Sequence, residues 1–293
     1  MRTSLVGFLA LAIVCGGQAR AGGAPQLKRV VSLAPSVTET LFALGAGGQL
    51  VGVCTFCDFP AAVAQIDRVG SYVAPSVEAI VAKAPDIVIG VPPNNPVTIE
   101  VLRRLGLRVV VVQVDTLTQI ETAMRTIAHE VGRDVEGERL INQVRQRIAA
   151  VRTRLHGAPP RRVLMVVGQN PLIAVGGGIF LNELITQAHG VNIAADASQQ
   201  WPRLSLEFAV AHAPEVIIDG SMGSEGKEET QRLSIWQHFP SLPAVREGRL
   251  YGRPSNVLLR PGPRLAEGFE ALARLIHPER FQATAADQRE GVR

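Results

Sequence analysis

The chain has 293 residues, 46% of them hydrophobic, which suits two domains of about 110 to 130 residues each better than one. Lysine and arginine number 30 against 26 aspartate and glutamate, giving a formal net charge of +4. No basic run exceeds pairs such as Arg161-Arg162, so the composition argues against a protein that binds nucleic acid.

The first 21 residues have the pattern of a secretory signal peptide. Arg2 supplies a positive start, residues 5–14 are apolar, and Ala-Arg-Ala at residues 19–21 is a cleavage site of the A-x-A type. The apolar stretch is too short to cross a bilayer as a helix, so an N-terminal membrane anchor is the less favoured alternative. We expect a mature protein that starts near Gly22 and works outside the cytoplasm.

Strands and helices are predicted to alternate through the first part of the chain. The sequence RVVSL predicts a first strand, and Pro35-Ser36 opens a helix directly after it. Alternation of this kind indicates a parallel sheet. The expected elements are strands at residues 29–33, 51–53 and 108–112 and helices at residues 35–44 and 98–105.

Two cysteines, Cys54 and Cys57, remain after removal of the signal peptide, in the loop sequence VGVCTFCDFP. A C-x-x-C pair can be a redox site, half of a zinc site or a small disulfide. The histidines have no paired spacing to complete a zinc site, and Asp58 and Pro60 follow where a thioredoxin-type motif would open a helix. We therefore expect either a local disulfide or two free thiols, and no metal site.

One phrase occurs twice, as SVEAIVAKAPDIVI at residues 76–89 and as SLEFAVAHAPEVII at residues 205–218. In each copy a serine can cap the first helical turn, a glutamate faces the positive end of the helix dipole, and apolar residues recur at helical spacing. Ala-Pro then ends the helix, and an acid with a β-branched run predicts a buried strand. The repeat predicts two similar α/β lobes, each with an acid at an equivalent helix start.

A long, charged helical pattern separates the two copies. Between about residues 134 and 156 the apolar residues fall on one stripe, and Gly157 with Pro159-Pro160 ends the helix. A helix of this length spans about 30 Å, which is enough to bridge two lobes. The second lobe is then expected to contain a strand at residues 162–167, a turn at Gly176-Gly177-Gly178 and a helix at residues 181–188. The residues after the glycines do not match a nucleotide-binding loop.

Four segments together resemble the periplasmic cobalamin-binding proteins of ABC importers. They are RVVSLAPSVTETLFALGAGGQLVGVCTFCDFP, SVEAIVAKAPDIVIG, FLNELITQAHGVNIAADASQQWPRLSLE and LLRPGPRLAEGFEALARLIHP. These proteins belong to a wider class of helix-linked solute-binding proteins that also takes siderophores and haem. The similarity runs from about residue 28 to residue 281.

The resemblance implies an α/β protein of two similar lobes with mainly parallel sheets, joined by one long helix. It divides the chain into a signal peptide (1–21), a first lobe (22–133), a linker helix (134–157), a second lobe (158–285) and a flexible tail (286–293). The implied cargo is a corrinoid, cobalamin, held between the lobes without a separate cofactor. The implied partners are an ABC transporter permease and its ATPase subunit, and the protein is expected to be a periplasmic monomer.

Functional residues of that family can be carried over to matching positions. A glutamate on each lobe contacts permease arginines in the family, which implies docking by Glu78 and Glu207; the alternative is that both acids only favour the helix dipole. Aromatic side chains line the family's cleft, and a core role is the alternative for each. The implied ligand contacts are Phe59, Tyr72 and Trp201, with Asn256 as a polar contact.

Two positions depart from the corrinoid pattern, and they keep other functions open. Val91 stands where some corrinoid binders carry an aromatic residue, and Phe59 replaces the family's tyrosine. A ferric siderophore or haem is therefore the alternative cargo, and haem would use Tyr72 as axial ligand. A thiol-redox enzyme acting through Cys54 and Cys57 is the more distant alternative. The sequence contains no G-x-S-x-G, H-E-x-x-H or dinucleotide motif, so we expect a binding protein without enzymatic activity.

Overall fold

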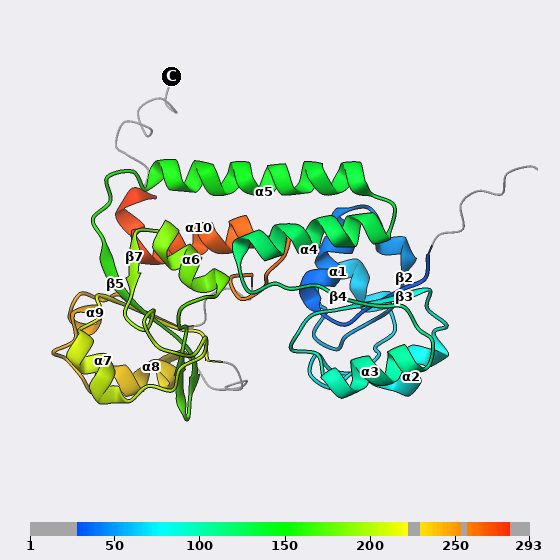
Figure 1. Ribbon diagram of the computed structural model, residues 1–293. Helices are drawn as coiled ribbons and strands as arrows, with labels where there is room; N and C mark the ends of the chain where they lie inside the picture. The colour runs from blue at the N-terminus through cyan, green and yellow to red at the C-terminus, as the bar shows by residue number, and fades with distance from the viewer. Residues whose placement is uncertain (1–27, 222–228, 253–256, 282–293) are drawn as a thin grey trace, which may run out of the picture.

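The computed structural model describes residues 28–221, 229–252 and 257–281. The expected signal peptide and C-terminal tail lie outside these residues. Figure 1 shows two α/β lobes side by side beneath one long helix, α5 (Asp134–Arg154). This is the helix that the charged, striped segment predicted.

The first lobe is built on a parallel sheet with strand order β2-β1-β3-β4. Its last helix begins at a capping box, because the Thr116 hydroxyl accepts from the Gln119 N–H and the Gln119 side chain accepts from the Thr116 N–H. The sequence analysis did not predict that helix. The elements are β1 (Val30–Ser32), α1 (Pro35–Ala43), η1 (Gly47–Gln49), β2 (Leu50–Val53), η2 (Ala61–Gln65), α2 (Val77–Ala82), β3 (Ile87–Gly90), α3 (Pro96–Arg104), β4 (Val109–Val111) and α4 (Leu117–Glu130).

The second lobe has a mixed sheet with strand order β6-β5-β8-β9, and β7 pairs with the beginning of β5. The pairings of β5 with β7 and β8, and of β8 with β9, are parallel, as predicted. The antiparallel hairpin of β5 with β6 was not predicted. The elements are β5 (Arg161–Gln169), β6 (Leu172–Ala174), α6 (Phe180–Gln187), β7 (Gly190–Asn192), α7 (Leu206–His212), β8 (Val216–Asp219), α8 (Glu229–Gln237), α9 (Pro243–Arg246), β9 (Leu250–Gly252), α10 (Leu265–Ile276) and η3 (Pro278–Arg280).

The two copies of the repeated phrase adopt the same conformation. Ser76 accepts a hydrogen bond from the Ala79 N–H at 3.2 Å, and Ser205 accepts one from the Phe208 N–H at 3.1 Å, so both serines are the predicted helix caps. The alanine before each proline, Ala84 or Ala213, has a left-handed backbone with φ of 43° or 44°. A proline disfavours the right-handed helical region for the residue before it, which explains why each helix stops there.

An arginine at the start of the neighbouring strand secures each copy. The Arg29 backbone N–H donates to the Asp86 carboxylate at 2.7 Å, and its guanidinium donates to the Ala84 carbonyl. Arg162 donates to Glu215 at 2.9 Å and to the carbonyl of the second left-handed alanine in the same way. The acid after each Ala-Pro therefore ties the end of a helix to the edge of the adjacent strand.

One apolar core extends through both lobes. Side chains of a strand alternate between the two faces of a sheet, and in β5 Val163 and Met165 enter this shared core. Leu164 and Val166 face a second cluster with Trp236 of α8, while a third cluster lies beneath α2 and α3. The shared core includes side chains of α1, α4, α5, α6 and α10, and α5 packs on both α4 and α10. The lobes are thus joined by packing as well as by the chain.

The described helices were also compared with the requirements of a membrane span. Within residues 28–221, 229–252 and 257–281, no helix combines the length and apolarity needed to cross a membrane.

The capping serines give a direct test of the repeated unit. Ser76→Ala or Ser205→Ala should lower the free energy of unfolding of the lobe concerned by about 1 kcal/mol, because a first-turn N–H loses its acceptor. Urea denaturation followed by circular dichroism measures this loss. Thr153→Ala is the control, since that hydroxyl donates to the Ala149 carbonyl within α5 and caps nothing. An equal loss from Thr153→Ala would contradict the capping role.

Candidate functional site

Two of the predicted ligand residues lie in neighbouring loops of the first lobe. Phe59 follows β2 and the two cysteines, and 43% of its surface is exposed. Its ring lies under the guanidinium of Arg264, with 3.9 Å from Cζ to the ring centre. Tyr72 is partly buried against the shared core, and burial raises the pKa of its phenol to about 12. At neutral pH the first lobe therefore offers one open aromatic ring and one neutral phenol.

Trp201 lies in the second lobe, on the loop between β7 and α7, and 45% of its surface is exposed. The loop is held by backbone hydrogen bonds from Gly176 to the Gln200 carbonyl at 2.8 Å and from Ala174 to the Pro202 carbonyl at 3.0 Å. A side chain on Gly176 would place its Cβ 2.3 Å from the Gln199 carbonyl oxygen. The triple glycine is thus needed for close approach to the loop that carries Trp201.

The structure does not bring all of the predicted ligand residues together. Asn256 lies outside the described residues. Among the residues that are described, no ring contact joins Trp201 to Phe59 or Tyr72, which belong to the other lobe. The sequence-predicted ligand site therefore consists of separate contributions from the two lobes.

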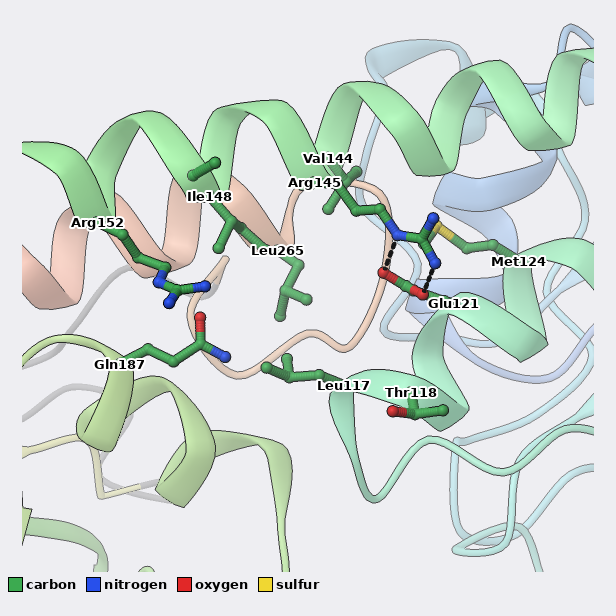
Figure 2. Close-up of a pocket in the computed structure, with 11 residues that line it drawn as sticks. Leu117, Thr118, Glu121, Met124, Val144, Arg145, Ile148, Arg152, Gln187 and Leu265 are labelled. Carbon is green, nitrogen blue, oxygen red and sulfur yellow. Dashed lines mark hydrogen bonds and ion pairs between the residues drawn. The ribbon is translucent and has the colours of Figure 1, made fainter.

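A cavity of about 260 Å³ lies elsewhere, between α4, α5, α6 and α10 (Figure 2). Its wall is formed by apolar side chains such as Leu117 and Met124 and by the ion pair of Arg145 with Glu121, 2.5 to 2.7 Å between nitrogen and oxygen. None of the predicted ligand residues lines this cavity. In the described part of the chain, no three His, Cys, Asp or Glu side chains gather closely enough to hold a metal ion.

The two predicted docking acids occupy equivalent positions. Glu78 and Glu207 are exposed in the first turns of α2 and α7. Figure 1 shows these helices on different lobes, each on the side of its lobe away from α5. Hydrogen bonds from its own backbone N–H and from the Ser205 hydroxyl hold the pKa of Glu207 below its ordinary value. The arrangement puts one carboxylate on each lobe at the same end of the molecule.

Cys54 and Cys57 are free thiols in the structure, and both are buried. Their sulfur atoms are hydrogen-bonded at 2.9 Å, and the Thr38 hydroxyl donates to the Cys57 sulfur at 3.1 Å. The hydrogen bond between the thiols lowers the pKa of Cys57 and raises that of Cys54. Arg68 donates to the carbonyls of both cysteines and so fixes the loop between them. The predicted disulfide stays a prediction.

Comparison with known proteins now places this architecture. The sequence profile of a family described as periplasmic binding protein matches residues 30–257, which is most of the chain. The chain belongs to the periplasmic binding protein family. Membership agrees with the two-lobed α/β fold and with the resemblance that the sequence predicted.

Individual relatives within the family differ in the ligand that their names state. A vitamin B12-binding protein of Vibrio cholerae is 28% identical over 245 residues, covering 83% of this chain and 87% of that protein. The crystal structure of the periplasmic vitamin B12 binding protein BtuF of Vibrio cholerae has a TM-score of 0.75 at 28% identity, covering 87% of this chain and 99% of that one. The periplasmic heme-binding protein RhuT from Roseiflexus sp. RS-1, in apo form, has a TM-score of 0.78 at 27% identity with the same coverage.

The sequence analysis missed several residues that shape this family's fold around the candidate site. Asn94 is buried; its amide donates to the backbone carbonyls of Tyr72 and Leu33, and its side-chain oxygen accepts from the Val91 N–H. Its position in the polar sequence PPNNP was the available signal. Glu39, Arg260 and Arg264 form an ion-pair cluster around Phe59, and no local pattern connects residues so far apart in the chain.

The burial of the cysteines gives a second prediction. Because both thiols are enclosed, a maleimide reagent should not label the folded protein over hours, whatever their redox state. In denaturant, free thiols should label at once, whereas a disulfide should label only after a reductant is added; intact-mass measurement separates the two cases. Rapid labelling of the folded protein would contradict the burial of the pair and would favour an accessible thiol-redox site.

Proposed function

We propose that this protein captures a corrinoid, cobalamin, between its two lobes and delivers it to the permease of an ABC importer. It would act in the periplasm as a monomer, with the ATPase subunit of the importer as an indirect partner. The carrying observation is the similarity to vitamin B12-binding proteins, which extends over 83% of this chain and 87% of the relative.

The exposed aromatic side chains support this cargo. A corrin ring presents a broad, largely apolar face, and ligand sites commonly match such faces with aromatic side chains and a few polar groups. Phe59 and Trp201 are both nearly half exposed, although large apolar residues are usually buried. They belong to different lobes, so a ligand between the lobes could contact both.

Haem is the second candidate, because a heme-binding protein is 27% identical with a TM-score of 0.78. A haem site usually needs an axial ligand such as histidine or tyrosine. The histidines of the chain do not occur in the loops that carry Phe59, Tyr72 and Trp201. Tyr72 would have to lose its proton to bind ferric iron as a phenolate, and its pKa of about 12 opposes that step. These observations favour the corrinoid.

Delivery requires a surface that a permease can bind in a fixed orientation. Glu78 and Glu207 provide one exposed carboxylate on each lobe, at helix starts that the repeat makes equivalent. Complementary charges at the rim of an interface steer association and fix orientation. We infer that both acids bind basic side chains of the permease.

Titration of the mature protein with cobalamin tests the cargo. Wild type should bind cobalamin in preference to haem and ferric siderophores. Trp201→Ala should weaken cobalamin binding by about 2 kcal/mol, roughly thirtyfold, because a flat contact is lost. Calorimetry is the suitable measurement, since the second tryptophan, Trp236, is fully buried and hydrogen-bonded to Asp219.

Val191→Ala is the control for that titration, because Val191 is another exposed apolar residue of the second lobe, on β7. It should leave both affinity and melting temperature nearly unchanged. Unchanged affinity in Trp201→Ala would remove this residue from the site. Tight binding of haem or a siderophore by wild type, without cobalamin binding, would overturn the corrinoid proposal.

Charge reversal tests the docking role. The double variant Glu78→Arg with Glu207→Arg should abolish uptake in cells, while ligand affinity and melting temperature stay close to wild type. Glu100→Arg with Glu136→Arg changes the net charge equally, on α3 and α5, and should still support uptake. If the Glu78 and Glu207 variant transports at the normal rate, both acids act only on their own helices.

A further inference from the structure

A buried carboxylate joins the first lobe to a distant segment of the chain. Glu39 of α1 is only 3% exposed. Arg264 donates to both of its oxygens, at 2.9 Å from Nε and 2.7 Å from Nη2, and Arg260 donates to it at 2.9 Å. The two arginines lie more than 200 residues later, in residues 257–264, the segment that enters α10 from the side of β9. We call this segment the strap.

The strap lies directly on α1. A Cβ on Gly262 would come within 3.3 Å of the Ser36 backbone, so this position accommodates little beyond glycine. Burying a carboxylate is costly unless it is paired and hydrogen-bonded, and an arginine fork satisfies both carboxylate oxygens at once. The Glu39 pair therefore fixes the strap, and with it the planes of the two guanidinium groups.

The same two arginines also contact the loop that carries Phe59. Arg260 donates to both oxygens of Asp58, which holds the pKa of that carboxyl below its ordinary value. Arg264 uses Nε and Nη2 for Glu39, which leaves the flat face of its guanidinium over the Phe59 ring, 3.9 Å away. One side of the ring thus rests on a cation that is itself held by a buried carboxylate, while 43% of the residue stays exposed.

We infer that Arg264 and Arg260 are positioning residues for the ligand site: the strap holds Phe59 from behind and presents its open side to a flat apolar ligand. The inference rests on the proposed function in taking Phe59 as a ligand contact. It adds that the aromatic surface of the first lobe is completed by a segment on the far side of the second sheet. The arginines act through Phe59 and do not themselves touch the ligand.

Lysine substitution separates position from charge. Arg264→Lys keeps the positive charge but cannot hold both Glu39 oxygens and cover the ring at once. The matched control is Arg274→Lys, because Arg274 also pairs with a glutamate, Glu270 at 2.7 Å, and lies over a ring, Phe281 at 4.6 Å, on α10. Asp58→Asn is a milder second variant, because it weakens the link from Arg260 to the loop and keeps the buried Glu39 pair.

Hydrogen exchange of residues 54–63 gives a readout without any ligand. Arg264→Lys should speed exchange in this segment by about fivefold or more, with a smaller increase in Asp58→Asn, because local contacts set the free energy of local opening. Arg274→Lys should leave this segment at the wild-type rate. Wild-type exchange rates in both Arg264→Lys and Asp58→Asn would overturn the inference.

A double-mutant cycle on ligand affinity gives the second readout. Arg264→Lys should lower cobalamin affinity by about three- to tenfold in the wild-type background and have no effect in Phe59→Ala. An equal loss in both backgrounds would show that Arg264 does not act through Phe59. If wild type does not bind cobalamin at all, the proposed cargo fails, and hydrogen exchange still decides whether the strap positions the loop.

Discussion

The lobes depend on an apolar core that they share beneath α5. Side chains of the central strands of both sheets, and of α4, α5 and α10, belong to this one cluster, so neither lobe is enclosed without the other. The strap adds a buried ion pair between Glu39 and the segment before α10. Large domain closure needs a few residues that absorb changes in backbone dihedrals, whereas these lobes are connected by a continuous helix, a packed core and a buried charge pair. The expected mode of capture is binding to a preformed site.

The repeated phrase was predictable because all of its determinants are local. A serine cap, an alanine before proline and a β-branched run act within a few residues of one another, and both copies adopt the predicted helix and strand. The acid after each proline has a structural task that the sequence did not reveal, since Asp86 and Glu215 each accept from the backbone of an arginine on the neighbouring strand. That partner lies more than 50 residues away in the chain. Local pattern predicted the element, and only the fold supplied the contact.

The elements that were missed have equally specific causes. The helix α4 carries a readable signal, the Thr116 and Gln119 capping box, which the sequence analysis did not use. The β5–β6 hairpin lies in a stretch with few apolar residues after Gln169, where periodicity is weak. The Glu39 cluster could not be predicted from one sequence, because its partners are separated by more than 200 residues and each arginine alone resembles an ordinary solvated side chain. Long-range ion pairs leave no periodic trace.

The fold also limits what similarity can say about the cargo. This chain matches a vitamin B12 binding protein and a heme-binding protein at nearly equal identity and TM-score, so the scaffold serves both ligands. Discrimination must therefore come from a few loop side chains and from what holds them. Here those side chains are the open ring of Phe59, the neutral phenol of Tyr72 and the exposed indole of Trp201, each fixed by a different device. A buried ion pair, a buried asparagine and a close glycine contact are what convert a common scaffold into a site with a defined shape.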